Sequence, residues 1–432
     1  AARLDIPAVM LTGGPMAAGE FEGQVVDLIT VFEGVARAES GQWSVAKLEQ
    51  LEAAACPGAG SCAGMFTANT MACVSEALGM SLPGTAAALA TGPDKQRLAF
   101  EAGEKAVDLA VNGPTTRQVL TRAAFLNACR VDLALGGSTN TALHLPAIAH
   151  EAGAEFSLAD FDRLSAETPH LASMSPGGPM RMQHLWEAGG VGAVMKRLEP
   201  LLVKEVVTVA GPGLAAYLPA ELPAVSYFDQ PVIHTLADPV HAQGGIAVLK
   251  GNLAPDGAVV KQTAVAPDNL VFSGPARCFG SEDAAVEAYS SGDLQPGEVI
   301  VVRYEGPAGG PGMREMLTLT SLISGGPLNG KVALITDGRF SGGSRGAVIG
   351  HVSPEAAQGG PIALVADGDL IELDIPGRQL NLRVAETELA RRREAWTPPA
   401  PRFTSGALAR YAALVTSAAT GAVLRSGCPD KE

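Results

Sequence analysis

Cysteine is scarce in this chain, which has 6 cysteines among 432 residues. Small secreted domains that depend on disulfides are much richer in cysteine, so a disulfide scaffold is excluded. The cysteines also show none of the paired Cys-x-x-Cys spacings of structural zinc sites. We therefore interpret them as reduced thiols or as ligands of a metal cluster.

Long apolar runs and an excess of basic charge are also missing. No segment has the length and apolar character of a membrane span, and no basic stretch leads into an apolar core and cleavage site. The 31 basic and 45 acidic residues give a formal net charge of −14, which attracts neither a nucleic-acid backbone nor an anionic membrane. We expect a cytoplasmic protein that acts on a small molecule, with no nucleic-acid or membrane partner.

Apolar residues, by contrast, are plentiful at 47% of the chain. At about 150 residues per domain, this length predicts two or three domains with sizeable cores. The 51 glycines and 30 prolines, with only 5% aromatic residues, indicate many tight loops between buried elements. This pattern is typical of α/β enzymes, whose sites lie in loops.

Residues 1–215 are predicted to form an α/β domain. The apolar run at 6–12 predicts a buried parallel strand, and its early position suggests a sheet that is incomplete at its start. Ser157 and Asp160 resemble a capping box that begins a helix. Other helices are expected within 21–55 and at about 63–82, 94–112, 115–130 and 182–198.

The second half of the chain has a different pattern. Prolines interrupt the region from about 204 to 240 without a long amphipathic period, so we place a linker at 216–240. Residues 241–432 are predicted to form a β-rich, barrel-like domain. Apolar runs predict its strands at 246–250, 259–261, 298–303, 332–335 and 362–365, and an Asp-Gly turn predicts a hairpin segment at 366–375.

A loop punctuated by glycines begins at Ala55, ends at Cys62 and runs directly into a predicted helix. The start of a helix carries partial positive charge and favours a thiolate, so Cys62 at this entrance is a candidate reactive or metal-bound residue. Free cysteine is also often a small buried hydrophobe, and that interpretation stays open.

Two other glycine-rich loops could bind an anionic group through their backbone N–H donors. One spans 136–141 and opens a helix. The other spans 337–346 and follows a predicted strand at its carboxyl end, where ligands bind in α/β folds. Glu315 is predicted in the first turn of a helix, where an acid also favours the helix dipole without any other role. His144 and His150 are not spaced to share one helical face, so we interpret them as core or boundary residues.

Several of these motifs together resemble the dihydroxy-acid dehydratase branch of the family that also holds sugar-acid and phosphogluconate dehydratases. The resemblance covers nearly the whole chain, and its most specific part is Thr-Asp-Gly-Arg-Phe-Ser-Gly-Gly at 336–343. The other stretches that carry it are 56–62, 65–70, 135–146, 310–317, 168–171 and 351–357.

The resemblance implies an N-terminal α/β domain, a C-terminal β-rich swivelling domain, and a homodimer or a dimer of dimers. It implies an iron–sulfur cluster held by three cysteines, with [2Fe–2S] favoured over [4Fe–4S], and a nearby Mg²⁺. By position, Cys62 is the third cluster ligand, Glu315 a magnesium ligand and Ser341 the general base. The residues implied to hold the substrate carboxylate are Ser138, Thr139, Asn140, Gly342 and Gly343.

The implied reaction removes water from a 2,3-dihydroxy-3-methyl carboxylic acid to give a 2-oxo acid for branched-chain amino-acid biosynthesis. In the family, two further cluster cysteines, a magnesium-binding acid and a Cys-Asp-Lys motif lie upstream of the segment that matches Ala1. Cys428 and its neighbours do not replace them, so we expect this chain to lack a stable cluster and turnover. Two alternatives stay open: a sugar-acid dehydratase, and a non-catalytic fragment that keeps the fold.

Overall fold

The structure is a computed structural model, and it describes residues 1–425. Contacts divide the chain into two compact units. Unit 1 comprises Ala1–Thr141 and Ile148–Ile246, and unit 2 comprises Ala142–Ala147 and the chain from Ala247 onward. The bounds expected from the sequence, 1–215 and 241–432 with a linker at 216–240, remain a prediction. Among residues 1–425, no helix has the length and hydropathy needed to cross a membrane.

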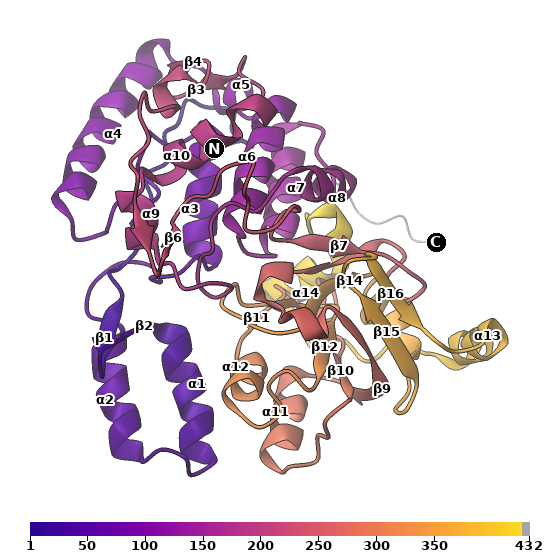
Figure 1. The fold of residues 1–432 in the computed structure, drawn as a ribbon. Helices are drawn as coiled ribbons and strands as arrows, with labels where there is room; N and C mark the ends of the chain where they lie inside the picture. Colours follow the sequence, from indigo (N-terminus) through magenta and orange to yellow (C-terminus); the bar gives the residue numbers. More distant parts are fainter. Residues whose placement is uncertain (426–432) are drawn as a thin grey trace. The chain divides into compact units, whose positions relative to one another are not determined.

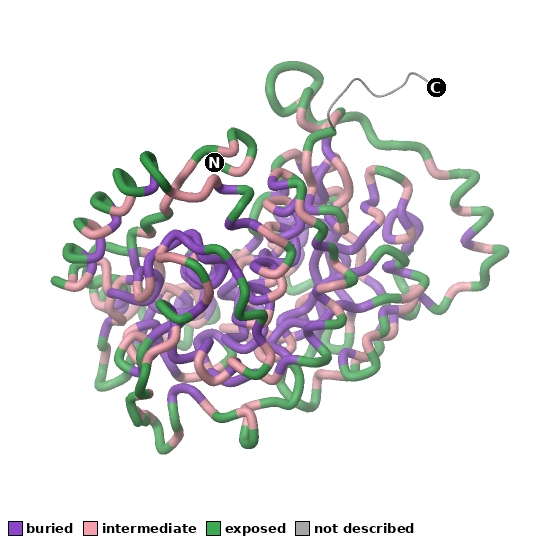
Figure 2. Tube along the Cα trace, turned by 90° about the horizontal axis from the view of Figure 1, so that it is seen from above, coloured by how far each residue is buried: buried purple, intermediate pink, exposed green. Residues whose placement is uncertain are grey.

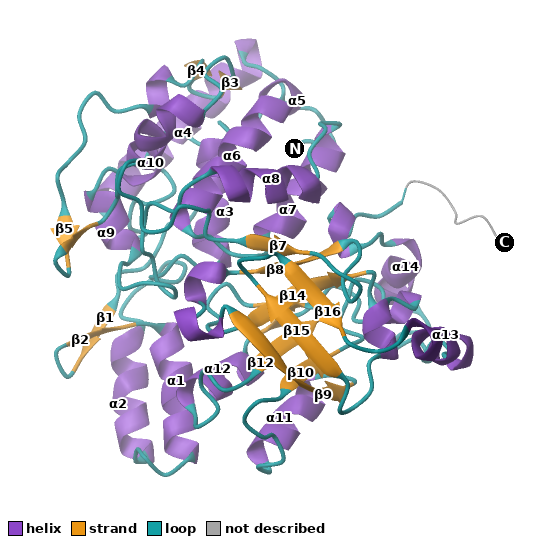
Figure 3. Cartoon of the chain, turned by 45° about the vertical axis from the view of Figure 1, so that its right-hand side comes forward, coloured by secondary structure: helices purple, strands orange, loops and turns teal. Residues whose placement is uncertain are grey.

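Unit 1 is built mainly from helices, with three short antiparallel strand pairs (Figures 1 and 3). The helices are α1 (Leu28–Glu39), α2 (Val45–Ala55), α3 (Thr67–Ala77), α4 (Pro93–Asn112), α5 (Thr116–Val119), α6 (Arg122–Leu135), α7 (Thr141–Ala152), α8 (Leu158–Glu167), α9 (Met182–Glu187) and α10 (Gly190–Leu198). The strand pairs are β1 (Gly19–Phe21) with β2 (Gln24–Val26), β3 (Val207–Thr208) with β4 (Gly211–Pro212), and β5 (Ser226–Tyr227) with β6 (Gln230–Pro231).

Local sequence signals set several of these helix ends. α8 begins at the predicted capping box, in which the Ser157 hydroxyl accepts from Asp160 N and the Asp160 carboxylate accepts from Ser157 N. α6 ends at Gly136, whose φ of 61° is left-handed and therefore favours glycine. Buried and exposed residues alternate along the helices, as expected when one helical face packs against a core (Figure 2).

The strand predicted at 6–12 does not form. Met10 N donates to Met80 O over 2.7 Å and Ile6 O accepts from Thr116 N over 3.1 Å, so the segment bonds to scattered points instead of a neighbouring strand. Ile6 is also 49% exposed, whereas a strand inside a parallel sheet is covered on both faces. The described part of unit 1 contains no parallel sheet, and the α/β prediction is wrong for it.

Unit 2 contains one eight-stranded sheet in the order β16-β15-β9-β10-β12-β14-β8-β7. The three pairings β9–β10, β10–β12 and β12–β14 are parallel, and the others are antiparallel. The strands are β7 (Ala247–Leu249), β8 (Gly257–Val260), β9 (Val271–Phe279), β10 (Val299–Val302), β12 (Ala333–Thr336), β14 (Val348–Ser353), β15 (Leu370–Asp374) and β16 (Gln379–Leu382).

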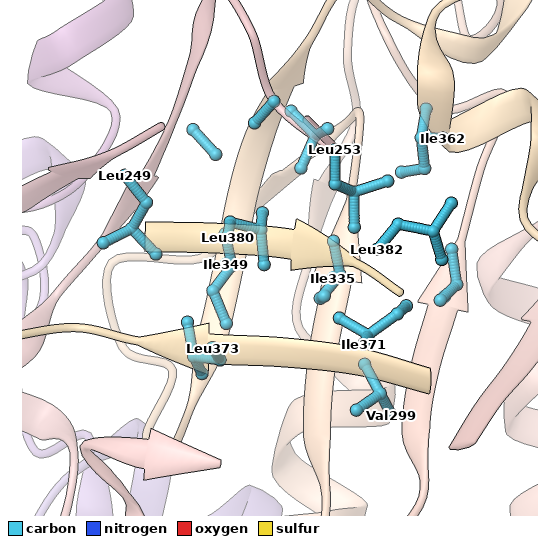
Figure 4. Packing of buried hydrophobic residues seen from close by; sticks show 14 of the residues in the cluster. Leu249, Leu253, Val299, Ile335, Ile349, Ile362, Ile371, Leu373, Leu380 and Leu382 are labelled. Atoms are coloured by element: carbon cyan, nitrogen blue, oxygen red, sulfur yellow. The ribbon is translucent and has the colours of Figure 1, made fainter. Parts of the chain in front are cut away.

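The sheet curls until its two edge strands nearly meet. Lys250, directly after β7, forms a parallel bridge with Gln379 of β16, and Leu380 N donates to Lys250 O over 2.9 Å. The enclosed side chains form an apolar core that includes Leu249, Ile335 and Leu373 (Figure 4). The predicted barrel-like sheet is therefore confirmed.

Alternate residues of the central strands pack on opposite faces of the sheet. In β10, Val299 and Val301 belong to the enclosed core, whereas Ile300 and Val302 pack with α11 (Glu282–Ser290) and α12 (Thr318–Gly325). A strand covered on both faces needs apolar residues throughout, which explains its continuous apolar run. The other helices of unit 2 are α13 (Glu386–Ala395) and α14 (Gly406–Leu414).

Two predictions for unit 2 need correction. The run at 362–365 is not a strand, because Pro361–Leu364 forms a 3₁₀ turn whose side chains fill the core. The residues before α12 do not start a helix at Glu315: Glu315–Met316 is the short strand β11, which pairs in parallel with β13 (Arg339–Phe340). Proline fixes φ and lacks an N–H, which explains why the run at 362–365 does not form a strand.

Candidate active site

The predicted site residues lie on both units. Unit 1 carries Cys62 and the loop from Ser138 to Asn140, and unit 2 carries Glu315 and the loop from Ser341 to Gly343. In unit 1 the predicted residues are held by side chains of one helix. In unit 2 they are held by the pairing of two short strands.

The first turn of α3 holds the Cys62 loop. The Asn69 side chain, which is 1% exposed, donates through Nδ2 to Gly64 O over 2.7 Å and also to Cys62 O. Its Oδ1 accepts from the Ser61 hydroxyl over 2.6 Å. One amide side chain therefore fixes the backbone on both sides of Cys62.

Cys62 is not at the helix entrance that the sequence predicted. α3 begins at Thr67 with Phe66 as its N-cap, and Cys62 lies upstream in the loop, where it is half-buried. The helix-dipole argument for a thiolate weakens with this separation, because the effect falls off beyond the first turn. The position of the thiol instead follows from Asn69.

The same helix turn holds the second loop. Ser138 N donates to Thr70 Oγ1 over 3.1 Å, and Asn140 Nδ2 donates to Thr67 Oγ1 over 2.9 Å. Ser138 and Asn140 are completely buried, while Thr139 is half-buried. Ser138 and Asn140 therefore fix the loop in place, and Thr139 has the more accessible side chain.

The other cysteines show a different environment. Cys73 and Cys129 are buried, and burial raises the pKa of both thiols well above its usual range. Cys56 is exposed, and no disulfide joins the cysteines of residues 1–425. Cys428 lies outside the described residues. Cys73 and Cys129 are therefore packing residues.

In unit 2, the β11–β13 pair brings Glu315 to the Ser341 loop. Glu315 is in register with Arg339 in the parallel pair, and Ser341 N donates to Met316 O over 2.8 Å. Gly342 N donates to Glu315 Oε1 over 3.1 Å. A carboxylate and a half-buried hydroxyl residue, far apart in sequence, are thus brought together by one strand pair and the loop that follows it.

The Ser341 hydroxyl also has a backbone donor. Gly343 N donates to Ser341 Oγ over 3.3 Å, and Gly342 and Gly343 are both buried. An N–H donor at this oxygen favours a build-up of negative charge on it. The geometry therefore suits a serine that accepts a proton.

Asp337 anchors this loop, and sequence reasoning did not assign it a role. Its buried carboxylate accepts from the backbone N–H groups of Tyr304 and Glu305, at 3.1 and 3.0 Å, and from Ala356 at 2.8 Å. Burial raises the pKa of Asp337 to about 6 despite these bonds. Its position directly after a buried strand was the signal that could have identified it.

Two family models match the chain. The model described as dihydroxy-acid/6-phosphogluconate dehydratase N-terminal matches residues 1–217, and the corresponding C-terminal model matches residues 231–422. The chain belongs to the dihydroxy-acid/6-phosphogluconate dehydratase family. The resemblance inferred from the motifs is confirmed, and the chain is a dehydratase, which is a hydro-lyase.

Individual relatives of this dehydratase are similar over nearly its whole length. It is 55% identical over 425 residues to dihydroxy-acid dehydratase 1 of Methanosarcina acetivorans, which covers 98% of this chain and 76% of that protein. The dihydroxy-acid dehydratases of Thermodesulfovibrio yellowstonii and Geobacter metallireducens are 54% and 55% identical, over the same shares. These similarities give no support to the expectation of an incomplete first domain or an inactive chain.

Dehydratases of this family use an iron–sulfur cluster and Mg²⁺. The thiol of Cys62 and the carboxylate of Glu315 are donor types that suit these two groups. Within residues 1–425, however, no three His, Cys, Asp or Glu side chains come together as a metal site. Each residue can therefore serve as one ligand, and the described residues complete neither group by themselves.

Proposed function

We propose that this dehydratase converts 2,3-dihydroxy-3-methyl carboxylic acids into 2-oxo acids in branched-chain amino-acid biosynthesis. The relatives that are 54–55% identical over 98% of the chain are named dihydroxy-acid dehydratases, which supports this substrate class. The observation that carries the proposal is the contact between the Ser341 loop and Glu315 of β11, made by the bond from Gly342 N to Glu315 Oε1.

Ser341 is the proposed general base. Its Oγ, as the alkoxide, takes the proton from C2, and the C2–H electron pair forms the double bond to C3 as hydroxide leaves C3 with the C–O pair. The proton then passes from Ser341 to this hydroxide, which gives water and restores the alkoxide, and the enol tautomerises to the 2-oxo acid. The N–H of Gly343 stabilises the serine oxygen while it lacks its proton.

Cys62 is the proposed cluster ligand and Glu315 the proposed magnesium ligand. When bound, an iron–sulfur cluster and Mg²⁺ supply Lewis acidity. We favour [2Fe–2S] over [4Fe–4S], as the family resemblance implies. We also propose a homodimer or a dimer of dimers and a cytoplasmic location.

Residues of two glycine-rich loops are proposed to hold the substrate carboxylate. In unit 2, Gly342 and Gly343 leave space for a ligand because they lack side chains. In unit 1, the same role falls to the loop from Ser138 to Asn140. Because Ser138 and Asn140 are bonded to α3, Thr139 is the side chain that we expect to reach the ligand.

The test compares Ser341→Ala with Ser273→Ala, a control at an exposed position of β9. Both proteins are reconstituted anaerobically with iron, sulfide and Mg²⁺, and kcat and KM are measured for 2,3-dihydroxy-3-methylbutanoate. Loss of a general base should lower kcat by about 10²- to 10⁴-fold, and the control should stay within about twofold.

A panel of aldonic acids, measured on the same preparations, separates the alternatives. Faster turnover of an aldonic acid than of the branched acid would contradict the proposed substrate in favour of a sugar-acid dehydratase. Identical behaviour of the wild type, Ser341→Ala and Cys62→Ser would instead favour a non-catalytic role.

A further inference from the structure

His351 interrupts the strand β14. Its φ of 57° lies in the left-handed region, and the pairing of β14 with β8 shifts register between Gly350 and Ser353. A non-glycine residue rarely adopts this conformation, so the surrounding structure must hold it there. Such irregularities in a strand commonly redirect a side chain next to a functional site.

The imidazole of His351 has an unsatisfied nitrogen. His351 is 4% exposed, and its Nε2 is buried with no hydrogen-bond partner among residues 1–425. A buried polar atom left without a partner is destabilising. The backbone at this residue is well held, because His351 N donates to Gly338 O over 2.8 Å. The unsatisfied atom is thus on the side chain of a residue whose backbone is held in place.

Burial, together with the positive charge of Arg339 and the neighbouring His144, lowers the pKa of His351 to about 3. The ring is therefore neutral near pH 7, with one nitrogen that donates and one that accepts. As the Nε2–H tautomer, His351 offers a hydrogen-bond donor without adding a positive charge to that of Arg339.

Arg339 connects this imidazole to the Ser341 loop. It belongs to β13, which pairs with the strand of Glu315 and leads directly to Ser341. Its charge acts on His144, on His351 and on Tyr411 of α14, so the four side chains form one polar cluster of unit 2. Glu315 is the acidic group that acts on His144.

The ligand that suits this cluster is an anionic oxygen. A guanidinium favours negative charge, and a neutral N–H beside it adds a directional bond to the same atom or group. The proposed substrate has one anionic group, its carboxylate.

We propose that His351, beside Arg339, is a substrate-binding residue whose Nε2–H donates to a carboxylate oxygen of the dihydroxy acid. This inference rests on the proposed function, because it takes Ser341 as part of the site. It adds a side-chain donor from β14 to the space that Gly342 and Gly343 leave for the ligand.

The test uses 2-hydroxy-3-methylbutanoate, which keeps the carboxylate but lacks the hydroxyl that leaves C3, and its neutral methyl ester. Dissociation constants are measured by calorimetry for the wild type, His351→Asn and His150→Asn. Asparagine tolerates a left-handed backbone, so it removes the imidazole with little backbone strain. His150 is exposed on α7 and is the matched control.

We expect His351→Asn to weaken binding of the acid by about tenfold or more, as for a lost hydrogen bond to a charged group, and to change ester binding much less. His150→Asn should leave both constants unchanged. An unchanged constant for the acid, or equal losses for the acid and the ester, would overturn the inference.

A second measurement works even if the His351 variants fail to fold. Imidazole ¹⁵N spectra of the wild type report on its 7 histidines, and a resonance that shifts with the acid and not the ester is expected. The resonance belongs to His351 if it persists when each of the other histidines is replaced in turn, and no shifting resonance in the wild type would overturn the inference. Wild-type protein that binds aldonic acids and not the branched acid would instead contradict the proposed function itself.

Discussion

The two units hold their predicted site loops in different ways. In unit 1, short polar side chains in the first turn of α3 bond to loop backbone, as Asn69 does at Cys62 and Gly64. In unit 2, backbone pairing between β11 and β13 places Glu315 and Ser341, and a buried sheet supports both. The first arrangement depends on particular side chains, whereas the second depends on strand register. The two units should therefore respond to different kinds of substitution.

The largest effect is expected from the apolar core of unit 2. Ile335 of β12 is completely buried, so Ile335→Ala should lower the free energy of unfolding of unit 2 by about 4 kcal/mol. Urea denaturation gives the loss, and hydrogen exchange followed by mass spectrometry should locate it in unit 2. Val271→Ala, at a position of β9 that is 63% exposed, is the control and should cost little. Equal losses of unfolding free energy in the two variants would contradict the idea that the apolar core supports the site loop of unit 2.

A buried carboxylate of unit 1 should make its stability depend on pH. Burial raises the pKa of Glu76 from 4.5 to about 7, although its carboxylate accepts from Gly84 N and Ala86 N at 2.9 Å each. The native state therefore binds this proton more tightly than the unfolded chain. Stability should be highest below about pH 4.5 for this group and should fall by roughly 3 kcal/mol as pH rises to about 7.

Glu76→Gln should remove that part of the pH dependence, measured as urea midpoints across the same range. Glu104→Gln, at an exposed position of α4, is the control and should keep the wild-type slope. A slope unchanged in Glu76→Gln would contradict the raised pKa.

Asn69→Ala tests the side-chain support of unit 1. It leaves the carbonyls of Cys62 and Gly64 and the Ser61 hydroxyl without this partner, so we expect a loss of about 2 kcal/mol and faster reaction of Cys62 with a thiol reagent. Asn112→Ala, at the exposed end of α4, is the control. Unchanged reactivity of Cys62 would show that Asn69 does not fix the loop.

The smallest effect compares two helix starts. Ser157 caps α8 through its hydroxyl, whereas Ser405 occupies the same position of α14 without a side-chain cap bond. Ser157→Ala should therefore cost about 1 kcal/mol, and Ser405→Ala should cost much less. Thermal melting with local hydrogen exchange measures both, and a larger loss at Ser405 would contradict the comparison.

Much of unit 2 could be predicted from the sequence, because strands covered on both faces need uninterrupted apolar runs. The runs near β7, β10 and β12 were identified in this way. Pro361–Leu364 was not, because an apolar run alone does not separate a strand from another buried segment. In unit 1, the apolar run at 6–12 was misread for the same reason.

The residues of the site were predicted from motifs, but the contacts that hold those residues in place were not. Glu315 was expected at a helix start, since a carboxylate after glycines is common there, and the structure places it in β11. Asp337 and Asn69 were not assigned roles. Their side chains bond to backbone groups, and a residue pattern does not show which backbone groups a side chain will reach.

The sequence by itself determined the family, the two-part organisation and the helix caps such as that of Ser157. These features depend on local composition, on short motifs and on neighbouring residues. Only the tertiary structure decided that α3 holds both loops of unit 1, that β11 pairs with β13, and that the pairing of β14 shifts register at His351. Each of these depends on long-range hydrogen bonds and burial, which form only when distant segments meet.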